Sequence, residues 1–454
     1  MQISNVYKKR IISALLLIVM VTGAGYLIGE LLRPVNYSTA VYDAEYKQMK
    51  ASKSKVDMVF LGASQVMVAF NPKIFEKKLS LHKVFNLSIG QQSMEGMYFQ
   101  LSEFLDEFQP KTVVIGITHG GLIQKESPKI IKLRMLERLH GKYRTSFIKE
   151  CLSIDELPYI IPIYGYRGYL FDIMKNVKNM QLFKAEGIYM KTPGWQSMGQ
   201  GFVVYPKSTP SGNMGIRENS IFDKSMVQDK TIYYLDKCIQ LCKEKNVQLF
   251  FMTPPTSAAN IYETDNYQAM IDYIEDYAKK NNIVYHNLSY LKGKEELLPD
   301  SMMYDFKHIS KDGSTVISNK YAEILSKSLK NIDTSEYFYP TLTEMKKSVN
   351  RIVAVDAKPQ IKNNTMTLSV QSLQNDNVTP YYQVLLAKDK KNFNPAVNWT
   401  NKKNLSFKVP KSSTYSVLLK ARQNENDTNF AWMAWEVDKR GKIRKIKRTS
   451  VGGA

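Results

Sequence analysis

The feature that most constrains the fold of this chain is an alternation of short apolar runs with longer amphipathic windows. The runs are rich in Val, Ile, Leu or Phe, as buried parallel strands are, and polar or turn residues bound each one. They cover residues 56–61, 84–87, 112–117, 247–252 and 283–285, with helical windows at 92–108, 230–246 and 267–282. This alternation predicts an α/β sandwich with a mostly parallel sheet over residues 56–330.

A segment from about residue 126 to residue 229 interrupts this alternation. It contains a basic helical stretch at 129–149, a tyrosine-rich stretch at 158–169 and a glycine-rich stretch at 194–215. We expect an insertion that covers the strand ends, where added segments often shape a substrate site. Its tyrosines and Trp195 form either a surface on which glycans stack or the small core of the insertion itself.

The N-terminus predicts a membrane anchor in residues 1–34. Residues 11–29 carry no charge, and as a helix they reach about 28 Å, close to the thickness of a bilayer core. Lys8, Lys9 and Arg10 precede them, so the positive-inside rule places the N-terminus in the cytoplasm and the rest of the chain outside the cell. A cleaved signal peptide is the alternative, although the stretch is long for a signal core and lacks a clear Ala-x-Ala end. Residues 35–55 would form a stalk or short helix leading from the membrane.

The C-terminal quarter has a different pattern and a high positive charge. Six short alternating runs, separated by turn residues, predict a small β-sandwich of immunoglobulin or fibronectin type III character over residues 341–454. The runs lie at 351–357, 365–370, 381–387, 405–409, 415–422 and 431–437, with a hairpin turn at 438–441. This quarter holds 21 Lys and Arg against 8 Asp and Glu, so it carries +13 of the net charge of +21. Such a surface suits an anionic polymer or lipid headgroups, or it is a solvated face that maintains solubility.

Composition argues against several other classes of protein. Three cysteines are too few for a disulfide framework, and Cys238 and Cys242, one helical turn apart, are expected to be buried thiols. The five histidines form no metal-binding cluster, so neither a metal nor another cofactor is expected. The basic runs lack the aromatic interleaving of nucleic-acid-binding motifs, so no nucleic-acid partner is expected.

Three residues have the types and the chain order of a nucleophilic triad. Ser64 ends the first apolar run in Gly62-Ala63-Ser64, and Asp305 and His308 lie near the end of the same domain. A serine hydroxyl needs a base to remove its proton, and the base needs an orienting carboxylate. Ser310 or Lys311 would then begin a helix that ends at Leu329. Read singly, Ser64 and Asp305 could each cap a helix and His308 could be a surface residue.

These motifs resemble the SGNH (GDSL-like) hydrolase superfamily over roughly residues 55–330. Within it, the chain is most similar to the membrane-anchored cell-envelope acylation branch, which includes DltD-like and AlgJ/AlgX-like proteins. Gly62-Ala63-Ser64 resembles the first block, with Ala63 in place of the usual Asp, and Phe70-Asn71-Pro72 recurs in envelope-associated members. Asn86-Leu87-Ser88-Ile89-Gly90 resembles the second block. The resemblance implies a three-layer α/β/α fold, with Ser64 as nucleophile, His308 as general base and Asp305 as its orienter.

The resemblance also implies an oxyanion hole made by the backbone N–H groups of Ser64 and Gly90 and by a third group. The third block normally provides an Asn side chain, but residues 114–121 contain none. Thr118 or His119 is the candidate replacement, and a histidine that caps the loop after a strand is the alternative role of His119.

The function that follows is an outward-facing serine O-acyltransferase that forms an acyl-Ser64 ester, with acetyl or D-alanyl as the acyl group. The acceptor would be an anionic cell-wall polymer or glycan, and a membrane-bound O-acyltransferase would be the acyl donor partner. A carbohydrate esterase and a non-catalytic envelope-binding protein are the two alternatives.

Overall fold

The computed structural model describes residues 5–125, 127–205, 220–348, 352–374, 378–388, 392–424 and 431–446. A five-stranded parallel sheet forms the centre of its larger part, in the order β2-β1-β3-β7-β9. The strands are β1 (Met58–Leu61), β2 (Val84–Asn86), β3 (Thr112–Gly116), β7 (Gln248–Thr253) and β9 (Val284–Asn287). Each lies within one residue or two of a predicted run, so the predicted α/β fold with a parallel sheet is confirmed.

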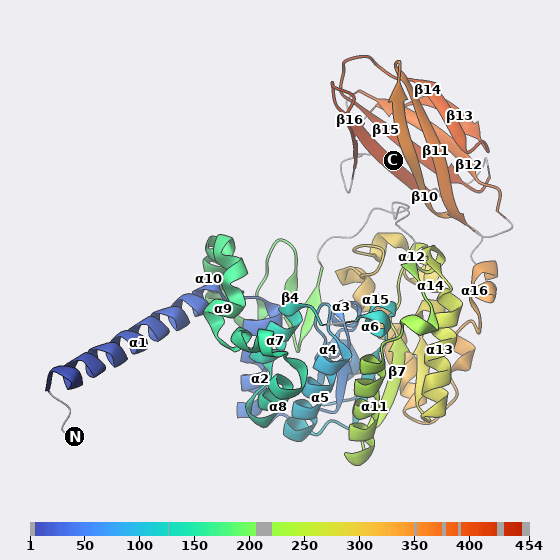
Figure 1. Ribbon diagram of the computed structural model, residues 1–454. Helices are drawn as coiled ribbons and strands as arrows, with labels where there is room; N and C mark the ends of the chain where they lie inside the picture. Colours follow the sequence, from blue (N-terminus) through green and yellow to red (C-terminus); the bar gives the residue numbers. More distant parts are fainter. Residues whose placement is uncertain are drawn as a thin grey trace.

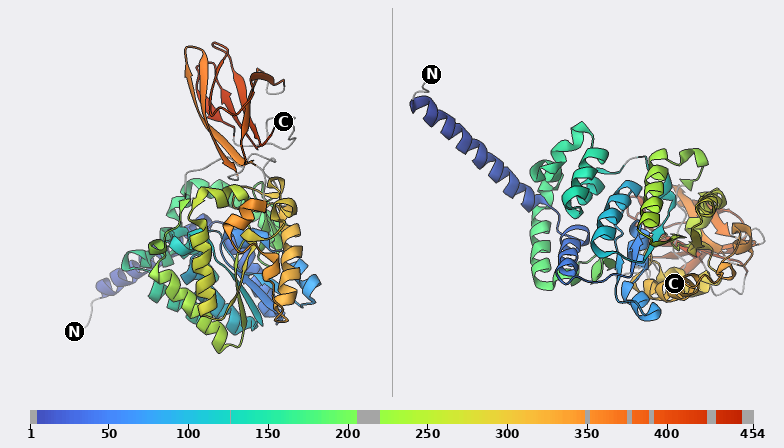
Figure 2. Two further views of the ribbon diagram at one scale, coloured as in Figure 1. Left: turned by 90° about the vertical axis from the view of Figure 1, so that its right-hand side faces the viewer. Right: turned by 90° about the horizontal axis from the view of Figure 1, so that it is seen from below.

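Helices cover both faces of this sheet (Figures 1 and 2). Side chains alternate between faces along a strand, so Val59 and Leu61 join one buried cluster and Met58 and Phe60 join the other. The first layer contains α2 (Tyr42–Ala51), α5 (Met94–Phe108), α8 (Gly141–Cys151), α11 (Asp229–Glu244) and α13 (Tyr267–Lys280). The second contains α3 (Ser64–Ala69), α4 (Pro72–Leu79) and α15 (Lys311–Ser328).

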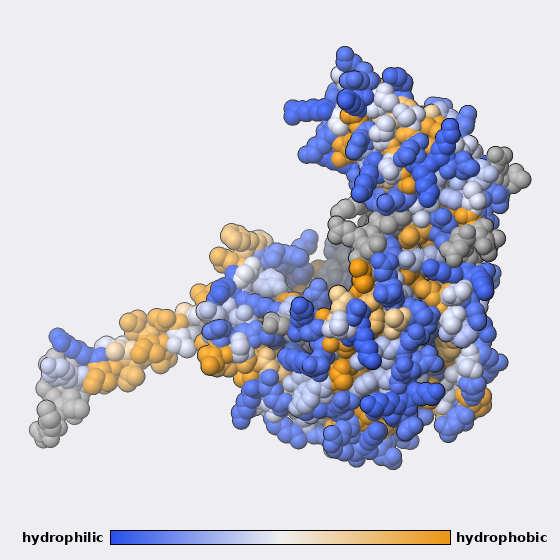
Figure 3. Space-filling view, turned by 45° about the vertical axis from the view of Figure 1, so that its right-hand side comes forward, coloured by the Kyte–Doolittle hydropathy of each residue, from blue (hydrophilic) through white to orange (hydrophobic). Residues whose placement is uncertain are grey.

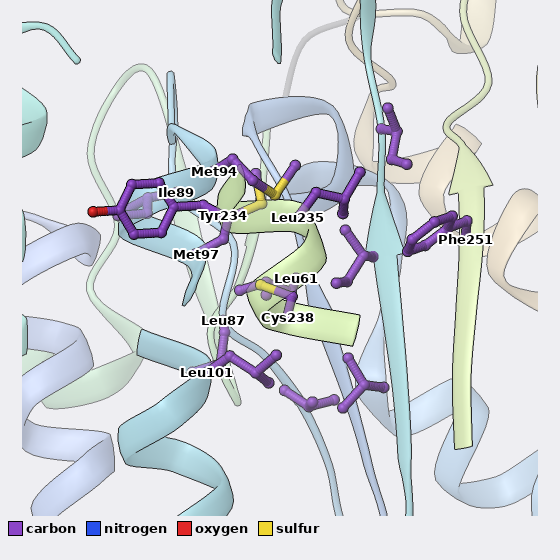
Figure 4. Packing of buried hydrophobic residues seen from close by; sticks show 14 of the residues in the cluster. Leu61, Leu87, Ile89, Met94, Met97, Leu101, Tyr234, Leu235, Cys238 and Phe251 are labelled. Carbon is purple, nitrogen blue, oxygen red and sulfur yellow. The ribbon is translucent and has the colours of Figure 1, made fainter. Parts of the chain in front are cut away.

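The first layer packs through interlocking aliphatic and sulfur-containing side chains (Figure 4). Leu61 and Leu87 meet Leu101 of α5 and Leu235 of α11 in one cluster. Each fully buried leucine contributes about 1.5–3 kcal/mol through removal from water. Cys238 lies in this cluster, and Cys151, Cys238 and Cys242 are all free and buried, as predicted for the latter two. Burial raises the pKa of the Cys242 thiol to about 12, which keeps it protonated and unreactive.

The segment between the apolar N-terminal helix and β1 packs against the α/β core. It contains a π-helix, η1 (Tyr37–Val41), followed by α2. Tyr42, Tyr46 and Met49 of α2 are buried in the first cluster, and the Tyr46 hydroxyl donates a hydrogen bond to Glu103 at 3.0 Å. The expected stalk is therefore a structural part of the first helical layer.

Helix α1 (Asn5–Leu32) projects from the rest of the molecule (Figure 1). In the described part of the chain, one helix is long and apolar enough to cross a membrane, and it covers Lys9–Leu32. A membrane anchor and a signal sequence both have this composition. The last turns of α1 contact α9 (Pro162–Tyr166), η3 (Arg167–Asp172) and α10 (Ile173–Glu186).

The segment expected as an insertion consists of short elements. Its basic stretch forms two helices, α7 (Lys129–Arg138) and α8, because Leu139 and His140 are extended and Gly141 has a φ of +49°. A hairpin of β4 (Gln196–Gly199) and β5 (Phe202–Val204) lies beside β2, where the Asn86 N–H donates to the Gln200 carbonyl at 2.9 Å. Residues 206–215 of the glycine-rich stretch lie outside the described residues.

The remaining elements of the α/β part are short. They are α6 (His119–Ile123), η2 (Ile154–Ile160), η4 (Gly187–Tyr189), β6 (Ser220–Ile221), η5 (Lys224–Met226), α12 (Ala258–Glu263), β8 (Thr264–Asp265), η6 (Leu288–Tyr290), α14 (Lys294–Leu297), η7 (Asp300–Met302), η8 (Ser335–Tyr337) and α16 (Leu342–Ser348).

The C-terminal part forms two antiparallel sheets that share one core, as predicted. One contains β10 (Ile352–Lys362), β11 (Thr365–Gln374) and β14 (Asn404–Lys408). The other has the order β13 (Asn394–Thr400), β12 (Tyr381–Ala387), β15 (Tyr415–Arg422), β16 (Ala431–Val437), β17 (Ile443–Lys445). The sequence did not predict β13 and β17, because both are edge strands of mixed polarity and β13 contains Pro395. The predicted turn at 438–441 joins β16 and β17.

Candidate active site

Ser64 lies at the carboxyl edge of the parallel sheet, as the first residue of α3 directly after β1. The chain passes from β1 to β2 on one side and then to β3 on the other, and ligands bind at such a switch in strand order. Gly62 follows the last residue of β1 and Gly116 ends β3, both beneath the Val66 side chain, and a Cβ on either glycine would overlap it. The two glycines therefore allow α3 to lie directly over the strand ends and hold Ser64 there.

The structure brings Ser64, His308 and Asp305 together in one chain of hydrogen bonds. The Ser64 Oγ lies 2.7 Å from Nε2 of His308, and Nδ1 of His308 lies 3.0 Å from both carboxylate oxygens of Asp305. A carboxylate can only accept, so we assign the ring proton to Nδ1, which donates to Asp305. Nε2 is then free to accept the Ser64 proton, which is the arrangement that activates a serine nucleophile.

Asp305 is held as a carboxylate. Its burial raises the pKa, but hydrogen bonds from the His308 ring and from the backbone N–H groups of Lys307 and His308 outweigh burial, and the pKa of Asp305 is lowered below its ordinary value. Both backbone donors lie 2.8 Å from Oδ1. The negative charge is therefore in place to stabilise an imidazolium at His308.

The loop that carries Asp305 and His308 is fixed by contacts from other elements. The Thr256 and Ser257 hydroxyls donate to the Phe306 carbonyl at 2.8 and 2.9 Å. The Gln65 side chain, next to the nucleophile, donates to the Lys307 carbonyl at 3.3 Å. Downstream, Ser310 caps α15 by accepting from the Gly313 N–H, so this helix begins where the sequence predicted.

Tyr205 is a neighbour of His308 that the sequence did not indicate. Its ring packs edge-on against the imidazole with centroids 5.8 Å apart, and Tyr304 stacks on Tyr205 at 4.1 Å. The Tyr205 carbonyl accepts from the Lys311 N–H at 3.1 Å. The one sequence signal was an aromatic residue directly after the apolar Phe202–Val204 run, which does not reveal what the residue contacts.

Gly90 lies beside the nucleophile, and Asn86 fixes the loop that carries it. The Asn86 side chain donates to the Val66 and Phe70 carbonyls at 3.1 and 3.3 Å, which joins the end of β2 to α3. A Cβ on Gly90 would lie 3.9 Å from that of Ser64. Within the described ranges, the backbone N–H groups of Ser64 and Gly90 have no hydrogen-bond acceptor, so both are free to donate to a substrate oxygen. Their role in an oxyanion hole stays a prediction.

Thr118 and His119 lie on the other side of Ser64. Thr118 caps α6 by accepting from the Gly121 N–H at 3.2 Å, and the His119 ring donates to the Ile221 carbonyl at 3.1 Å. Burial lowers the pKa of His119, which favours its neutral form. Among the residues that the structure describes, neither side chain hydrogen-bonds to Ser64, and both line a hollow of about 30 Å³ with Gln65. Their predicted contribution to the oxyanion hole remains a prediction.

A larger cavity of about 260 Å³ lies beyond Gly90. Tyr37, Arg134 and Trp195 line it, and a Cβ on Gly90 would lie 3.6 Å from the Tyr37 hydroxyl and 3.9 Å from Nη1 of Arg134. Tyr37 and Trp195 pack edge to face at 5.0 Å. Nη1 of Arg134 donates to the Gly90 carbonyl at 3.2 Å, and in the described part of the chain its buried Nε has no acceptor. The sequence pattern had singled out Trp195 but neither Tyr37 nor Arg134.

Comparisons with known proteins give little beyond this geometry. No protein-family model and no curated protein match the chain. Similar solved structures include a GDSL-like lipase from Bacteroides thetaiotaomicron, at 14% identity and a TM-score of 0.30 over 63% of this chain and 98% of that chain. The psychrotrophic esterase EstA from Pseudoalteromonas sp. has 12% identity and a TM-score of 0.28 over 61% and 100%. A two-domain esterase active on acetylated mannans has 10% identity and a TM-score of 0.26 over 88% and 96%. At these identities and TM-scores the likeness carries no argument about function. The candidate catalytic residues are therefore identified from the geometry of the site alone.

Proposed function

We propose that this protein is an SGNH-type serine O-acyltransferase of the cell envelope, in which Ser64 carries the acyl group as an ester. The observation that carries the proposal is the continuous hydrogen-bonded chain from Ser64 through His308 to Asp305 at the carboxyl edge of the sheet. The site requires no metal for this chemistry, because all three groups of the serine mechanism are side chains of the protein.

In the first half-reaction, the Ser64 Oγ attacks the carbonyl carbon of the acyl donor while Nε2 of His308 takes the hydroxyl proton. In this proposal, the tetrahedral oxyanion accepts hydrogen bonds from the backbone N–H groups of Ser64 and Gly90. As it collapses, the bond to the leaving group breaks and His308 returns the proton to that group. The product is an acyl ester on Ser64, and Asp305 stabilises the transient imidazolium.

In the second half-reaction, an acceptor hydroxyl gives its proton to Nε2 of His308 and attacks the ester carbonyl. The second tetrahedral intermediate collapses with return of the proton to Ser64 and release of the acylated acceptor. Water can replace the acceptor through the same steps, so the triad serves an esterase equally well. Acceptor binding therefore decides between the two reactions.

The larger cavity supports a glycan-like acceptor. Tyr37 and Trp195 offer aromatic rings and Arg134 offers a cationic guanidinium next to Gly90. Aromatic stacking with a sugar and a charge-assisted bond to a phosphate or carboxylate suit an anionic polymer. In this proposal α1 anchors the chain with its catalytic part outside the cell, acetyl or D-alanyl groups come from a membrane-bound O-acyltransferase, and the basic C-terminal sheets hold the polymer.

The test uses the purified full-length protein with p-nitrophenyl acetate and a polyol acceptor such as glycerol. We expect a mass increase of one acetyl group that peptide mapping places on Ser64, and acetylated glycerol that increases with acceptor concentration. Acetyl-Ser64 with acetate as the sole product would support the esterase alternative. Absence of both ester and turnover would contradict catalysis and support a non-catalytic envelope protein.

A further inference from the structure

Part of the segment between α7 and β4 is fixed directly to the apolar helix α1. Gly25 and Gly29 lie one turn apart on α1, and α9 rests on the face that they form. The backbone of Pro162 and Ile163 approaches Gly29 so closely that no Cβ fits there, and Cγ2 of Ile163 lies 3.8 Å from the Cβ position of Gly25. Small residues four apart allow this close helix contact. The depth of α9 is therefore set by the depth of α1.

Polar contacts at the end of α1 prevent α10 from sliding relative to it. The buried Asn176 of α10 donates to the Leu31 carbonyl and accepts from the Val35 N–H, both at 2.7 Å. Arg33 lies 3.3 Å from Glu137, whose side chain is 8% exposed. These bonds join α1, α7 and α10 into one unit.

The depth of this unit follows from the length of the span. A bilayer core of about 30 Å takes about 20 helical residues, so a span that begins after Arg10 ends near Glu30. Gly29 then lies at the outer boundary of the hydrocarbon, and Gly25 lies about 8 Å below Glu30. Since α9 contacts both glycines, it lies at the level where hydrocarbon meets the headgroups.

The exposed side of the segment from α9 to α10 carries several large apolar side chains, with the charged Arg167, Asp172 and Lys175 between them. We define the apolar collar as the exposed residues Ile161 (55%), Tyr164 (40%), Leu170 (54%), Phe171 (98%) and Met174 (79%). Figure 3 shows orange on the projecting helix α1 and further orange patches on the body of the molecule near the place where α1 joins it. Phe171 is exposed over nearly its whole surface, and the other four collar residues lie between residues 161 and 174. Exposed apolar side chains gathered in one segment mark an interaction site.

Cationic and aromatic residues accompany the collar. Arg167 and Lys175 are exposed beside it, and the Arg167 guanidinium lies 4.0 Å from the centre of the Tyr164 ring. Tyrosine rings at the headgroup level, with Arg and Lys groups that reach toward the phosphates, are typical of membrane interfaces. Depth, exposed apolar groups and flanking charge therefore all fit a lipid surface.

We propose that the apolar collar is embedded in the outer-leaflet interface of the bilayer that α1 spans, so that two elements hold the protein to the membrane. The inference rests on the proposed anchor and is independent of the chemistry at Ser64. It fixes the orientation of the α/β part relative to the membrane. The cavity lined by Leu32, Tyr37 and Arg134 then lies just above the headgroups, so a substrate can reach it from the membrane surface.

The experiment uses the full chain, reconstituted alone into phosphatidylcholine–phosphatidylglycerol vesicles. An NBD fluorophore is attached to a cysteine in the variants F171C and M174C, and the native thiols stay unlabelled because they are buried. V19C, in the middle of α1, reports on the anchor, and V284C, at an apolar position that is 47% exposed on β9, is the matched control. Unchanged thermal unfolding of each labelled variant shows that it is folded.

We expect lipids with a shallow doxyl group to quench the labels at 171 and 174 several-fold more than the label at 284. Aqueous iodide should quench the label at 284 more than the labels at 171 and 174. Lipid quenching at 19 together with control-level lipid quenching at 171 and 174 would overturn the collar and leave the anchor intact. Absence of lipid quenching at 19 as well would overturn the anchor and the collar with it. Labels at 171 and 174 that are protected from both lipid and iodide would indicate a protein contact and would also overturn the proposal.

Discussion

The described part of the chain contains two hydrogen-bonded Ser–His pairs, and the surroundings of the two histidines differ. The Ser64 Oγ lies 2.7 Å from Nε2 of His308, and the Ser328 Oγ lies 2.9 Å from Nε2 of His286. His308 has a carboxylate on its other nitrogen and a side chain that is 21% exposed. His286 is fully buried, and its other nitrogen faces the Tyr321 hydroxyl at 3.2 Å.

The difference shows that a short Ser–His distance is insufficient to identify a nucleophile. Proton transfer to His286 would create a buried imidazolium with no carboxylate beside it in the described chain, and burial already lowers the pKa of His286 to about 4. Transfer to His308 places the charge next to Asp305. We therefore interpret the His286 pair as a structural link between β9 and α15, and the His308 pair as the candidate nucleophile and general base.

The largest expected difference in activity is between two variants that each remove one serine hydroxyl. Ser64→Ala should lower kcat/KM for p-nitrophenyl acetate by about 10⁴-fold or more, because the nucleophile itself is lost. Ser328→Ala should leave kcat/KM within about twofold, because the Ser328 hydroxyl bonds to His286 and makes no contact with the triad. Equal kinetic losses in the two variants would contradict the distinction between the pairs.

Asp305→Asn tests the carboxylate that separates the two histidines. The amide retains an acceptor oxygen for the loop N–H groups but loses the charge and the control of the imidazole tautomer. We expect kcat to fall about 10³–10⁴-fold, with a melting temperature close to that of the unaltered protein. The check is steady-state kinetics together with thermal unfolding, and a kcat within tenfold of the starting value would show that His308 works without its carboxylate.

The lowered pKa of His286 should make the free energy of unfolding depend on pH in the acid range. Its pKa is about 4 in the folded state and about 6.5 in the unfolded chain, so unfolding takes up a proton between these values. Stability should therefore fall as the pH drops from about 6.5 to 4, by up to about 3 kcal/mol. His286→Gln should flatten this part of the curve of unfolding free energy against pH, measured by urea titration at each pH. An unchanged slope would contradict the lowered pKa of His286 in the folded protein.

The smallest effect is the structural contribution of the Ser328 hydroxyl. Ser328→Ala removes a buried hydrogen bond and should lower the unfolding free energy by about 1 kcal/mol. Ser326→Ala is the matched control on the same helix, because its hydroxyl is exposed and donates to the Glu323 carbonyl, so its cost should stay below about 0.5 kcal/mol. Equal losses in urea unfolding would mean that the buried pair adds nothing to stability.

The sequence predicted the α/β strands and the relation of Ser64, Asp305 and His308 because both depend on local patterns. Buried strands are short apolar runs, and the three residues lie where strands or helices begin or end. In contrast, the approach of Tyr205 to His308 and of Arg134 to Gly90 depends on the path of the chain between residues 126 and 229. Contacts over such distances leave no periodic signal in a single sequence.

The docking of α1 was unpredictable for a related reason. Gly25 and Gly29 lie in a stretch whose composition predicts a span, but composition does not reveal what packs against it. The strands β13 and β17 were not predicted because neither alternates buried and exposed residues, whereas the edge strand β14 does.

A fluorophosphonate probe tests the central claim most directly, because it reacts with serines that a neighbouring base activates. After incubation of the folded full-length protein with the probe, peptide mass spectrometry should find the phosphonyl adduct on Ser64 and leave Ser328 unmodified. Asp305→Asn should slow the labelling of Ser64. An unmodified Ser64 in folded protein, or equal labelling of Ser64 and Ser328, would contradict the assignment of Ser64, His308 and Asp305 as a catalytic triad.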